Sequence, residues 1–434
     1  MYAPLLRSAH PNGKVIERSA GSTMTQAVKR APHTGPLAGM KVLELAQIMA
    51  GPTCGLLLAD MGADVIKVEK LPGGDDSRGY REPRINGISA PYLVMNRNKR
   101  AMAINLKLPE GKAVLLRMVK DADVLTENYR VGTLEKLGLG YEVLKTVNPG
   151  LIYCAISGYG RTGPYADKGG FDLIAQGFAG LMSITGEPGG APVKTGNSVA
   201  DICAGILAAT GICAAYAHKL KTGQGQMVET SLMDAALQQT YWQAASYFAT
   251  GQSPGPTGSA HLLSAPYQAF QTSNGWINIG GANQSNWERI ARVLGQTNWL
   301  SDPRFESNTA RMAHRATLVE LMQAILSQHD SEHWLQAFDA AGVPAGPVHT
   351  IGEALSHPQT LARGMVQHID HPELGSMQTI GCPIHFSETP TRIDHAAPSL
   401  GQDTEVLLLE FGYSPSEIEA LVACGAVATP ASLT

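Results

Sequence analysis

The sequence predicts an α/β protein with a doubly wound parallel sheet. A strand–helix–strand unit begins near residue 42, and short apolar runs then alternate with helical segments as far as about residue 228. Short β-branched runs joined by one helix form a βαβ unit, and such units in series build a parallel sheet. After Leu232 the pattern changes to longer helices and alternating strands, which predicts a second, smaller domain.

The first strand–helix–strand unit indicates where a ligand binds. A strand at Val42–Leu45 leads through Pro52 into a helix, and a second strand follows at Val65–Val68. Pro52 suits a first helical position because it has no N–H, and Gly62 suits the helix end. Ligands of parallel sheets bind beyond the carboxyl ends of the strands, so the loop 46–51 is the first candidate site. The unit lacks G-x-G-x-x-G, which favours a nucleotide-like ligand other than NAD.

The later elements follow in chain order. In the large domain we expect strands at Ala101–Leu106, Ala122–Glu127, Leu151–Ser157 and Gln226–Thr230, and helices at Pro109–Lys120, Leu134–Leu137 and Asp201–Lys219. Beyond it we expect a helix at Met233–Ala249, strands at Tyr267–Phe270 and Trp276–Ile279, and final helices at Thr404–Phe411 and Ser416–Ala423. The predicted domains are an N-terminal extension (1–34), a large domain (35–230), a small domain with linkers (231–366) and a C-terminal part returning to the large domain (367–434).

Composition narrows the class of protein. A hydrophobic share of 44% with 16% charged residues describes a soluble protein with a large core. The net charge of -4 argues against nucleic-acid binding. Six cysteines without a C-x-x-C pair predict reduced thiols in a cytoplasmic protein, not disulfides or a zinc site. The apolar run Ile202–Ala217 is shorter than the roughly 18 residues of a membrane span, so we expect a buried helix and no membrane association.

Residues 1–34 leave two interpretations open. They carry five Arg or Lys against one Glu, with scattered Ser and Thr. A transit peptide has this composition and would place the protein in the mitochondrial matrix. A poorly packed bacterial extension also has it and is compatible with the cytoplasm.

The distribution of histidines restricts the chemistry. Between His33 and His218 there is no histidine, so this half of the chain has no imidazole for general-base or triad chemistry. His329 and His333 are spaced i, i+4 but lack H-E-x-x-H, which favours a solvated helix face. We therefore expect no metal site.

Two aspartates remain as candidate catalytic groups. Asp201 lies at the start of a long helix, where an aspartate is either an N-cap or a carboxylate kept ionised by the helix dipole and hence nucleophilic. Asp172 follows Gly169 and Gly170, whose backbone N–H groups can approach an oxyanion closely, although a simple turn has the same sequence.

Basic residues precede these aspartates. The run 96–100 reads NRNKR and comes before a strand. Alone it indicates a solvated turn, whereas beside the first βαβ unit it predicts a phosphate-binding cluster that uses charge-assisted hydrogen bonds. The basic side chains in question are Lys70, Arg97, Lys99, Arg100 and Lys107.

Six motifs in register resemble the family III coenzyme A transferases, the group of carnitine and formate CoA-transferases. The resemblance runs from about Pro36 to the C-terminus. The motifs read LAQIMAGPTCGLLLADMGADVIKVEK, NRNKRAMAINLK, TENY with GLGYEVLKTVNPGLIYCAISGYGRTGPY, GGFDLIAQGFAG, ADICAGILAATGICAA and, later, GVPAGPV with SLGQDTEVL.

The resemblance implies a mechanism and a set of site residues. In that family an aspartate attacks the acyl-CoA thioester and becomes an aspartyl-CoA thioester, which passes CoA to an incoming acid. The nucleophile falls on Asp201, and Asp172 takes the place of a neighbouring acid that shapes the pocket. The implied CoA contacts are Ile48, Met49, Ala50, Lys70, Ile104 to Lys107, Asn128, Tyr129 and Lys136, to which the basic cluster adds Arg100. Lys70 and Lys136 stand where the formate enzymes carry arginine, so phosphate contacts there are expected to be less bidentate.

The resemblance also implies a Rossmann-like large domain, a smaller α/β domain and an interlocked homodimer. Coenzyme A would be a substrate and product, with no permanently bound cofactor. The short stretch Thr257–Ser264 replaces the glycine-rich loop of the formate enzymes, which argues against formate and oxalate. The layout is most similar to enzymes that move CoA from succinyl-CoA to a dicarboxylic acid. Candidate specificity residues are Gln47, Tyr159 and His261.

Two rival functions remain open. The 2-methylacyl-CoA racemases or epimerases share the fold but read GHD where this chain reads Gly170-Phe171-Asp172, and the stretch without histidine removes their second base. A CoA-binding regulatory protein without turnover is the second rival.

Overall fold

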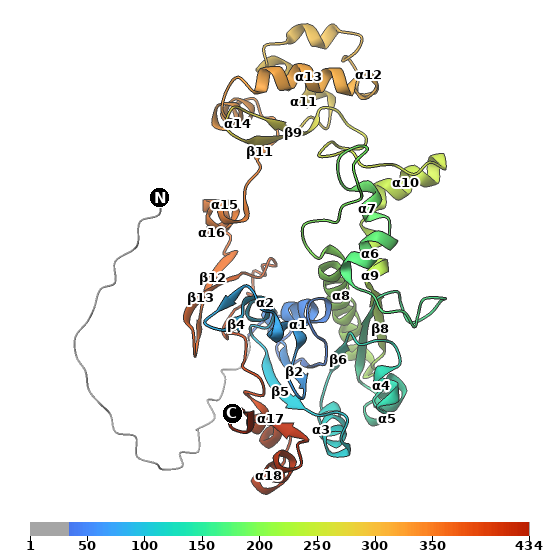
Figure 1. Cartoon of the computed structure of the whole chain (residues 1–434), viewed down its shortest axis with the longest axis vertical. Helices are drawn as coiled ribbons and strands as arrows, with labels where there is room; N and C mark the ends of the chain where they lie inside the picture. The colour runs from blue at the N-terminus through green and yellow to red at the C-terminus, as the bar shows by residue number, and fades with distance from the viewer. Residues whose placement is uncertain (1–33, 434) are drawn as a thin grey trace, which may run out of the picture. The chain divides into compact units, whose positions relative to one another are not determined.

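A computed structural model of the chain describes residues 34–433 (Figure 1). The two interpretations of the N-terminal extension therefore lie outside the described residues. The large sheet has seven strands in the order β14-β5-β2-β1-β6-β7-β8. Numbered along the chain, its six parallel strands follow the order 3-2-1-4-5-6 of the Rossmann fold, so the predicted fold class is confirmed.

The strands and helices of this sheet are close to the expected ranges. The parallel strands are β1 (Lys41–Glu44), β2 (Asp64–Lys70), β5 (Arg100–Ile104), β6 (Val124–Glu127), β7 (Ile152–Ser157) and β8 (Met227–Ser231). The helices between them are α1 (Ala50–Asp60), α2 (Ala90–Met95), α3 (Pro109–Val119), α4 (Thr133–Lys136), α5 (Tyr141–Val147), α6 (Asp172–Phe178), α7 (Leu181–Ile184) and α8 (Val199–Thr222), with a 3-10 turn η1 (Asp76–Gly79) and a small hairpin β3 (Arg84–Ile85) and β4 (Ile88–Ser89).

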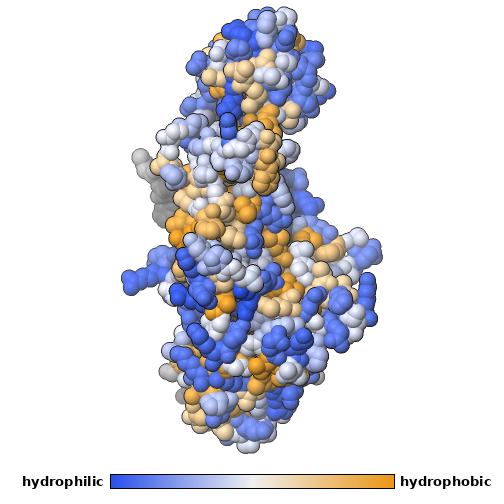
Figure 2. Space-filling model, turned by 90° about the vertical axis from the view of Figure 1, so that its right-hand side faces the viewer, coloured by the Kyte–Doolittle hydropathy of each residue, from blue (hydrophilic) through white to orange (hydrophobic). Residues whose placement is uncertain are grey.

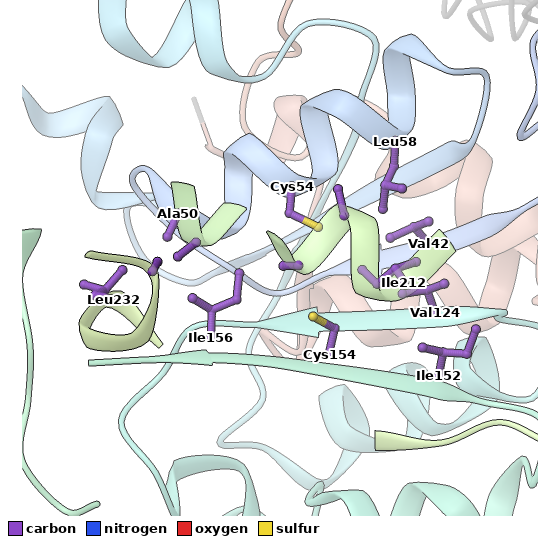
Figure 3. Close-up of a cluster of buried hydrophobic side chains, with 14 of the residues drawn as sticks. Val42, Ala50, Cys54, Leu58, Val124, Ile152, Cys154, Ile156, Ile212 and Leu232 are labelled. Atoms are coloured by element: carbon purple, nitrogen blue, oxygen red, sulfur yellow. The ribbon is translucent and has the colours of Figure 1, made fainter. Parts of the chain in front are cut away.

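Alternating strand residues build a separate hydrophobic core on each face of the sheet. Val42 packs with α1, α6, α8 and α9 (Leu232–Gln238), whereas its neighbour Leu43 packs with α3, α5, α17 (Thr404–Glu410) and α18 (Pro415–Ala423). Figure 3 shows Cys54 of α1, Ile212 of α8 and Cys154 of β7 meeting in the first core. The sheet is therefore a middle layer, covered on both faces.

Helix boundaries differ from the expected ones at three places. Pro52 is the third residue of α1, not the first, because the helix begins at Ala50. Asp201 is the third residue of α8, whose N-cap is Ser198, so Asp201 is not an N-cap. The single helix expected at 233–249 is divided at Gln239–Thr240 into α9 and α10 (Tyr241–Thr250).

A smaller antiparallel sheet forms the centre of the following region. It consists of β9 (Tyr267–Gln271), β10 (Trp276–Gly280) and β11 (Ala345–Pro347), in the order β11-β10-β9. Its apolar side packs with helices α11 (Gln284–Val293), α13 (Arg315–Leu326) and α14 (Ser331–Ala340), while α12 (Asn308–Ala313) contributes a buried guanidinium. That guanidinium, Arg311, donates to the carbonyls of Ala265 and Phe305 and lies over the Trp287 ring.

The chain then returns to the large sheet. It passes through α15 (Ile351–Ser356), α16 (Pro358–Ala362) and the hairpin β12 (Val366–His371) and β13 (Gly375–Ile380). Asn98 receives the returning segment, because its Oδ1 accepts from the N–H groups of Asp394 and His395. Strand β14 (Val427–Ala428) then pairs antiparallel with β5, an edge strand that the sequence did not predict, and α19 (Pro430–Leu433) ends the described chain.

One helix of residues 34–433, α8, is long and apolar enough to cross a membrane by length and composition alone. It packs against α1, α9, β7 and β8, and a core helix of a soluble protein passes the same test.

A buried ion pair supports the return of the chain. Arg97 Nη2 lies 2.6 Å from Asp60 Oδ2, with both side chains almost fully buried. Asp60→Ala should lower the free energy of unfolding by about 3 kcal/mol, because it leaves the Arg97 charge buried without its partner. Urea unfolding measures this loss.

The pair Arg304–Asp302 is a matched control, because its separation of 2.7 Å is similar but both side chains are much more exposed. Asp302→Ala should leave the unfolding curve almost unchanged. Equal effects of the two substitutions would contradict the role given to burial.

Candidate active site

The loops beyond the carboxyl ends of β1 and β6 meet at the switch point of the sheet. β1 and β6 are neighbours, and the helices that follow them leave on opposite faces, which makes this crevice the usual ligand site of the fold. Asn128, directly after β6, accepts from the Gln47 N–H at 2.8 Å and donates to the Gln47 carbonyl at 2.8 Å. The two loops are thereby fastened to each other. Two predicted CoA contacts, Ile48 and Met49, lie in the first loop, and a third, Ala50, is the first residue of α1.

Ile48 has a backbone conformation that β-branched residues rarely adopt. Its φ is +67°, in the left-handed region, and such strain persists only where the surroundings enforce it. The enforcing group is Asp75, whose two carboxylate oxygens lie 3.1 and 3.2 Å from the Ile48 N–H. Strained backbone is typical of functional loops, which agrees with the ligand site predicted here.

A buried ionic network lies under this loop. The Lys67 ammonium contacts Glu44 Oε1 at 3.1 Å, Asp75 Oδ2 at 2.8 Å and the Ala46 carbonyl at 3.0 Å. The Lys99 ammonium donates to the same Glu44 Oε1 and to the Pro52 carbonyl, each at 3.0 Å. The loop is therefore held at its start by Lys67, through the Ala46 carbonyl, and just beyond its end by Lys99, through the Pro52 carbonyl.

Charge balance within the network shows in the pKa values. Although burial opposes it, Lys67 lowers the pKa of Asp75 to about 2. Burial lowers the pKa of Lys67, but Glu44 and Asp75 outweigh it and raise this pKa above its ordinary value. Burial dominates at Lys99 and lowers its pKa to about 8.

Gly55 of the first βαβ unit is required by close packing against Glu44. A Cβ on Gly55 would lie 1.7 Å from Glu44 Oε2, so this position accepts only glycine while the network stands on it. This packing explains a glycine in α1 that forms no pyrophosphate cradle.

The structure divides the predicted basic cluster into two groups. Three of the basic residues form ion pairs with carboxylates. Arg97 pairs with Asp60 and Lys99 with Glu44. Arg100 pairs with Asp64 at 2.5 Å and with Glu410 at 2.7 Å. Arg100 is also the first residue of β5, at the edge of the sheet opposite the switch point. The structure thus does not bring Arg100 to the predicted CoA site, and the run NRNKR is structural.

Three lysines do lie at the carboxyl edge and are exposed. Lys70 ends β2, Lys107 follows β5, and Lys136 ends α4 after β6. Lys70 has an ion pair with Asp76, whose side chain is also exposed. These ammonium groups are accessible to phosphates.

The remaining predicted contacts are partly or fully covered. Ile104 is fully buried and its side chain belongs to the core, so only its backbone and the following residues to Lys107 can face a ligand. The Tyr129 N–H donates to Glu127 Oε2 at 2.8 Å. Burial raises the pKa of Glu127 to about 7.

Asp201 and Asp172 come together at the amino end of α8. Asp172 is the first residue of α6, and its Oδ1 accepts from the Ala200 N–H at 2.8 Å. Ser198 provides no side-chain cap, so Asp172 caps α8 from another helix, one residue before Asp201. Burial, and then the charge of Asp172, raises the pKa of Asp201 to about 7.

Close backbone packing holds the segment before Asp172 against the end of β7. A Cβ on Gly158 would lie 2.7 Å from the Gly170 Cα, so the loop after β7 and the loop before α6 approach each other closely at two glycines. The predicted glycine-rich approach is therefore a contact between two loops. Burial, and then the charges of Asp75 and Asp201, raise the pKa of Tyr80, which follows η1.

The three predicted specificity residues are spread over different surroundings. Gln47 is in the first loop, and Tyr159 packs edge-on against Tyr165 and Phe178. His261 stacks on Tyr267 at 5.0 Å and lines a separate cavity of about 310 Å³. The described residues contain no group of three His, Cys, Asp or Glu arranged for a metal.

Sequence reasoning missed Asp75, Tyr80 and Gln176. Asp75 follows two glycines after the second strand, a position that indicates a turn and gives no sign of its bond to Ile48. The i, i+4 spacing of Asp172 and Gln176 was a usable signal for their contact.

Comparison with known proteins decides the family. Residues 37–404 match the family described as CoA-transferase family III. The chain belongs to this family. The structure is also similar to the crystal structure of a CAIB/BAIF family protein from Brucella suis, with a TM-score of 0.78 and 38% identity over 87% of this chain and 100% of that one.

Relatives of this CoA-transferase have names that specify substrates. A protein of Agrobacterium fabrum named succinate–glutarate CoA-transferase is 39% identical over 89% of this chain and 98% of its own length. Human succinyl-CoA:glutarate CoA-transferase is 34% identical over 90% of each chain. The succinyl-CoA–D-citramalate CoA-transferase of Chloroflexus aurantiacus is 38% identical over 85% of this chain and 92% of its own length.

The raised pKa of Asp201 predicts a stability effect that depends on pH. Between the unfolded pKa of about 3.9 and the folded value of about 7, the folded chain binds more protons, so this group lowers stability as pH rises. Asp201→Asn should therefore raise the free energy of unfolding at pH 8 by about 1 to 2 kcal/mol, after allowance for solvent screening, and by less at pH 5.

Urea unfolding at both pH values measures the difference. Asp339→Asn, at an exposed position of α14, is the control and should show no such dependence. A gain for Asp201→Asn that is equal at both pH values would contradict the assignment.

Proposed function

We propose that the protein is an acyl-CoA:carboxylate CoA-transferase in which Asp201 carries CoA as a thioester. The observation that carries the proposal is the partly buried Asp201 carboxylate at the amino end of α8, beside a second carboxylate that is already engaged as a cap. Asp201 is the third residue of α8 and so lies at the positive end of the helix dipole, which favours the anionic nucleophile. Burial and Asp172 act against the dipole and raise the pKa of Asp201 to about 7, so part of the carboxylate is ionised at neutral pH.

The bond changes balance without a further reactant. The Asp201 carboxylate attacks the acyl-CoA carbonyl and expels CoA thiolate, giving a mixed anhydride. The thiolate attacks the aspartyl carbonyl and releases the donor acid as a carboxylate, which leaves aspartyl-CoA. The acceptor carboxylate attacks this thioester, and the thiolate then attacks the acceptor's acyl carbonyl, which forms the new acyl-CoA and restores Asp201.

The carboxyl edge of the sheet supports CoA binding. We infer that Lys70, Lys107 and Lys136 contact the phosphates of CoA. The backbone of residues 48–50, together with Asn128 and Tyr129, would contact the rest of the CoA molecule. Lysines are point charges, so each phosphate contact would be less directional than that of an arginine. CoA would be a substrate only, and no permanent cofactor is proposed.

We infer succinyl-CoA as donor and a dicarboxylic acid as acceptor. Relatives that cover nearly the whole chain are named for succinate with glutarate, D-citramalate or, in Haloarcula marismortui, mesaconate. A coupled assay of several acids with succinyl-CoA and acetyl-CoA tests this inference. Preference for a monocarboxylic acceptor, or for acetyl-CoA, would contradict it.

We further propose that the chain acts as a homodimer in the cytoplasm. Large apolar side chains at the surface support a homodimer: Phe171 beside α6 and Trp242 and Phe248 on α10 are exposed by 72%, 65% and 82%. Contiguous exposed apolar patches mark protein–protein interaction sites. Figure 2 shows apolar patches, in orange, within an otherwise hydrophilic surface. Analytical ultracentrifugation tests the oligomeric state, and a monomer at micromolar concentration would contradict it; cell fractionation tests the location.

Asp201→Ala should reduce CoA transfer about a thousandfold or more while CoA still binds, because the nucleophile is lost and the CoA contacts stay. Mass spectrometry after hydroxylamine trapping should find a modified Asp201 peptide only in the unchanged enzyme given acyl-CoA. Asp234→Ala is a matched control, since Asp234 is the third residue of α9 as Asp201 is of α8.

Three outcomes would count against the proposal. Turnover retained by Asp201→Ala would move the nucleophile to Asp172. An unmodified Asp201 peptide in the unchanged enzyme would favour CoA binding without turnover. Uptake of α-deuterium from heavy water by a 2-methylacyl-CoA, without an acceptor acid, would indicate a racemase or epimerase.

A further inference from the structure

A buried side-chain amide stands behind the two aspartates. Gln176 is on α6, one helical turn after Asp172, and none of its surface is exposed. Its Nε2 donates to Asp172 Oδ2 at 2.7 Å, and its Oε1 accepts from the Thr195 N–H at 3.0 Å. The amide thus links α6 to the loop that leads into α8.

The orientation of this amide is fixed by its partners. The Thr195 N–H can only donate, so the oxygen of Gln176 must face it and the nitrogen must face Asp172. The other oxygen of Asp172 accepts from the Ala200 N–H. Each oxygen of the Asp172 carboxylate therefore accepts a hydrogen bond from a different partner.

The Asp172 carboxylate is therefore held at one position relative to Asp201. Its contact with Ala200 places it at the amino end of α8, where Ser198 offers no side-chain cap. After burial, the charge of Asp172 is the cause that raises the pKa of Asp201. Movement of Asp172 would change both the cap and this charge.

We propose that Gln176 is a positioning residue, which holds the Asp172 carboxylate on the amino end of α8 and so sets the charge that Asp201 faces during CoA transfer. The inference rests on the proposed function, in which Asp201 is the nucleophile. Gln176 acts through Asp172 and touches no reacting atom.

Other charged and titratable groups lie near these elements, and the Arg130 guanidinium packs against Gly169, three residues before Asp172. Tyr80, beyond η1, is the second group whose ionisation is coupled to that of Asp201. The Lys194 ammonium, on the loop before α8, donates to the Thr195 carbonyl at 2.9 Å. Substitution of Gln176 leaves Tyr80 in place but also removes the bond to Thr195, whose carbonyl holds Lys194. An altered pH dependence is therefore assigned to Asp172 only through the double substitution described below.

The measurement is the rate of aspartyl-CoA formation as a function of pH. Stopped mixing with acyl-CoA and mass spectrometry of the Asp201 peptide give this rate, whose midpoint in the unchanged enzyme should lie near 7. Gln176→Met keeps the length of the side chain but removes both hydrogen bonds. Its midpoint should move down by about one pH unit, because Asp172 is no longer held at the amino end of α8 and repels Asp201 less.

A double-substitution cycle tests the route through Asp172. Asp172→Asn should move the midpoint in the same direction, and Asp172→Asn with Gln176→Met should give little further shift, because both act through one charge. Additive shifts would overturn the proposed route.

Gln176→Glu provides a second test should Gln176→Met fail to fold. At low pH a protonated glutamic acid can still donate to Asp172 and accept from Thr195, so the rate should be close to that of the unchanged enzyme. Above the pH at which it ionises, two carboxylates face each other and the rate should fall about tenfold or more. The same rate as the unchanged enzyme at every pH would overturn the proposal.

Gln323→Met is the matched control. The Gln323 amide also uses both of its ends, donating to the Gln271 carbonyl at 2.7 Å and accepting from the Gln271 N–H at 3.0 Å, within the small sheet region. It should leave the midpoint unchanged. If the unchanged enzyme forms the Asp201 adduct and Gln176→Met folds with the same midpoint, the positioning role fails while the proposed function stands; if no adduct forms at all, the proposed function itself fails.

Discussion

The site depends on the buried ion network of Glu44, Lys67, Asp75 and Lys99. Its two carboxylates balance its two ammonium groups, so charges that would each be costly inside a protein compensate one another. A buried network of this kind adds little net stability compared with an apolar core, but it tolerates few alternative arrangements. Three of its hydrogen bonds go to the backbone at Ala46, Ile48 and Pro52, and they fix the first loop where β1 and β6 part.

This network explains how a Rossmann-like sheet dispenses with a glycine-rich cradle. In dinucleotide-binding sheets, glycines let the first loop approach a pyrophosphate. Here side chains beneath the loop impose its conformation, including the left-handed Ile48, and the cationic groups available to phosphates are lysines on separate loops. The residues that impose the conformation of the loop are therefore different from the lysines that are available to a charged ligand. At the amino end of α8, Asp172 is engaged as a cap, whereas Asp201 has a pKa raised to about 7 by burial and by the charge of Asp172.

The sequence was informative wherever local pattern decides structure. The apolar runs located β1, β2, β6 and β7. The motifs singled out Asp172 and Asp201, and the structure brings both to the amino end of α8. It was misleading where long-range pairing decides. The run NRNKR has the composition of a phosphate site, yet its partners Asp60, Glu44 and Asp64 come from α1, β1 and β2, and no local pattern shows that they are near. The short strand β14 escaped for the same reason, since two residues carry no periodicity and gain their structure only from β5.

The late position of β14 in the sequence has a consequence for folding during synthesis. β5 is made early, but the strand that covers its free edge is residues 427–428, more than three hundred residues later. During synthesis the edge of β5 is therefore unpaired, and it can pair with other chains until β14 has been synthesised. A truncation that removes residues 427–434 would thus leave the edge of β5 exposed in the finished protein and favour aggregation, although Asp201 is unchanged.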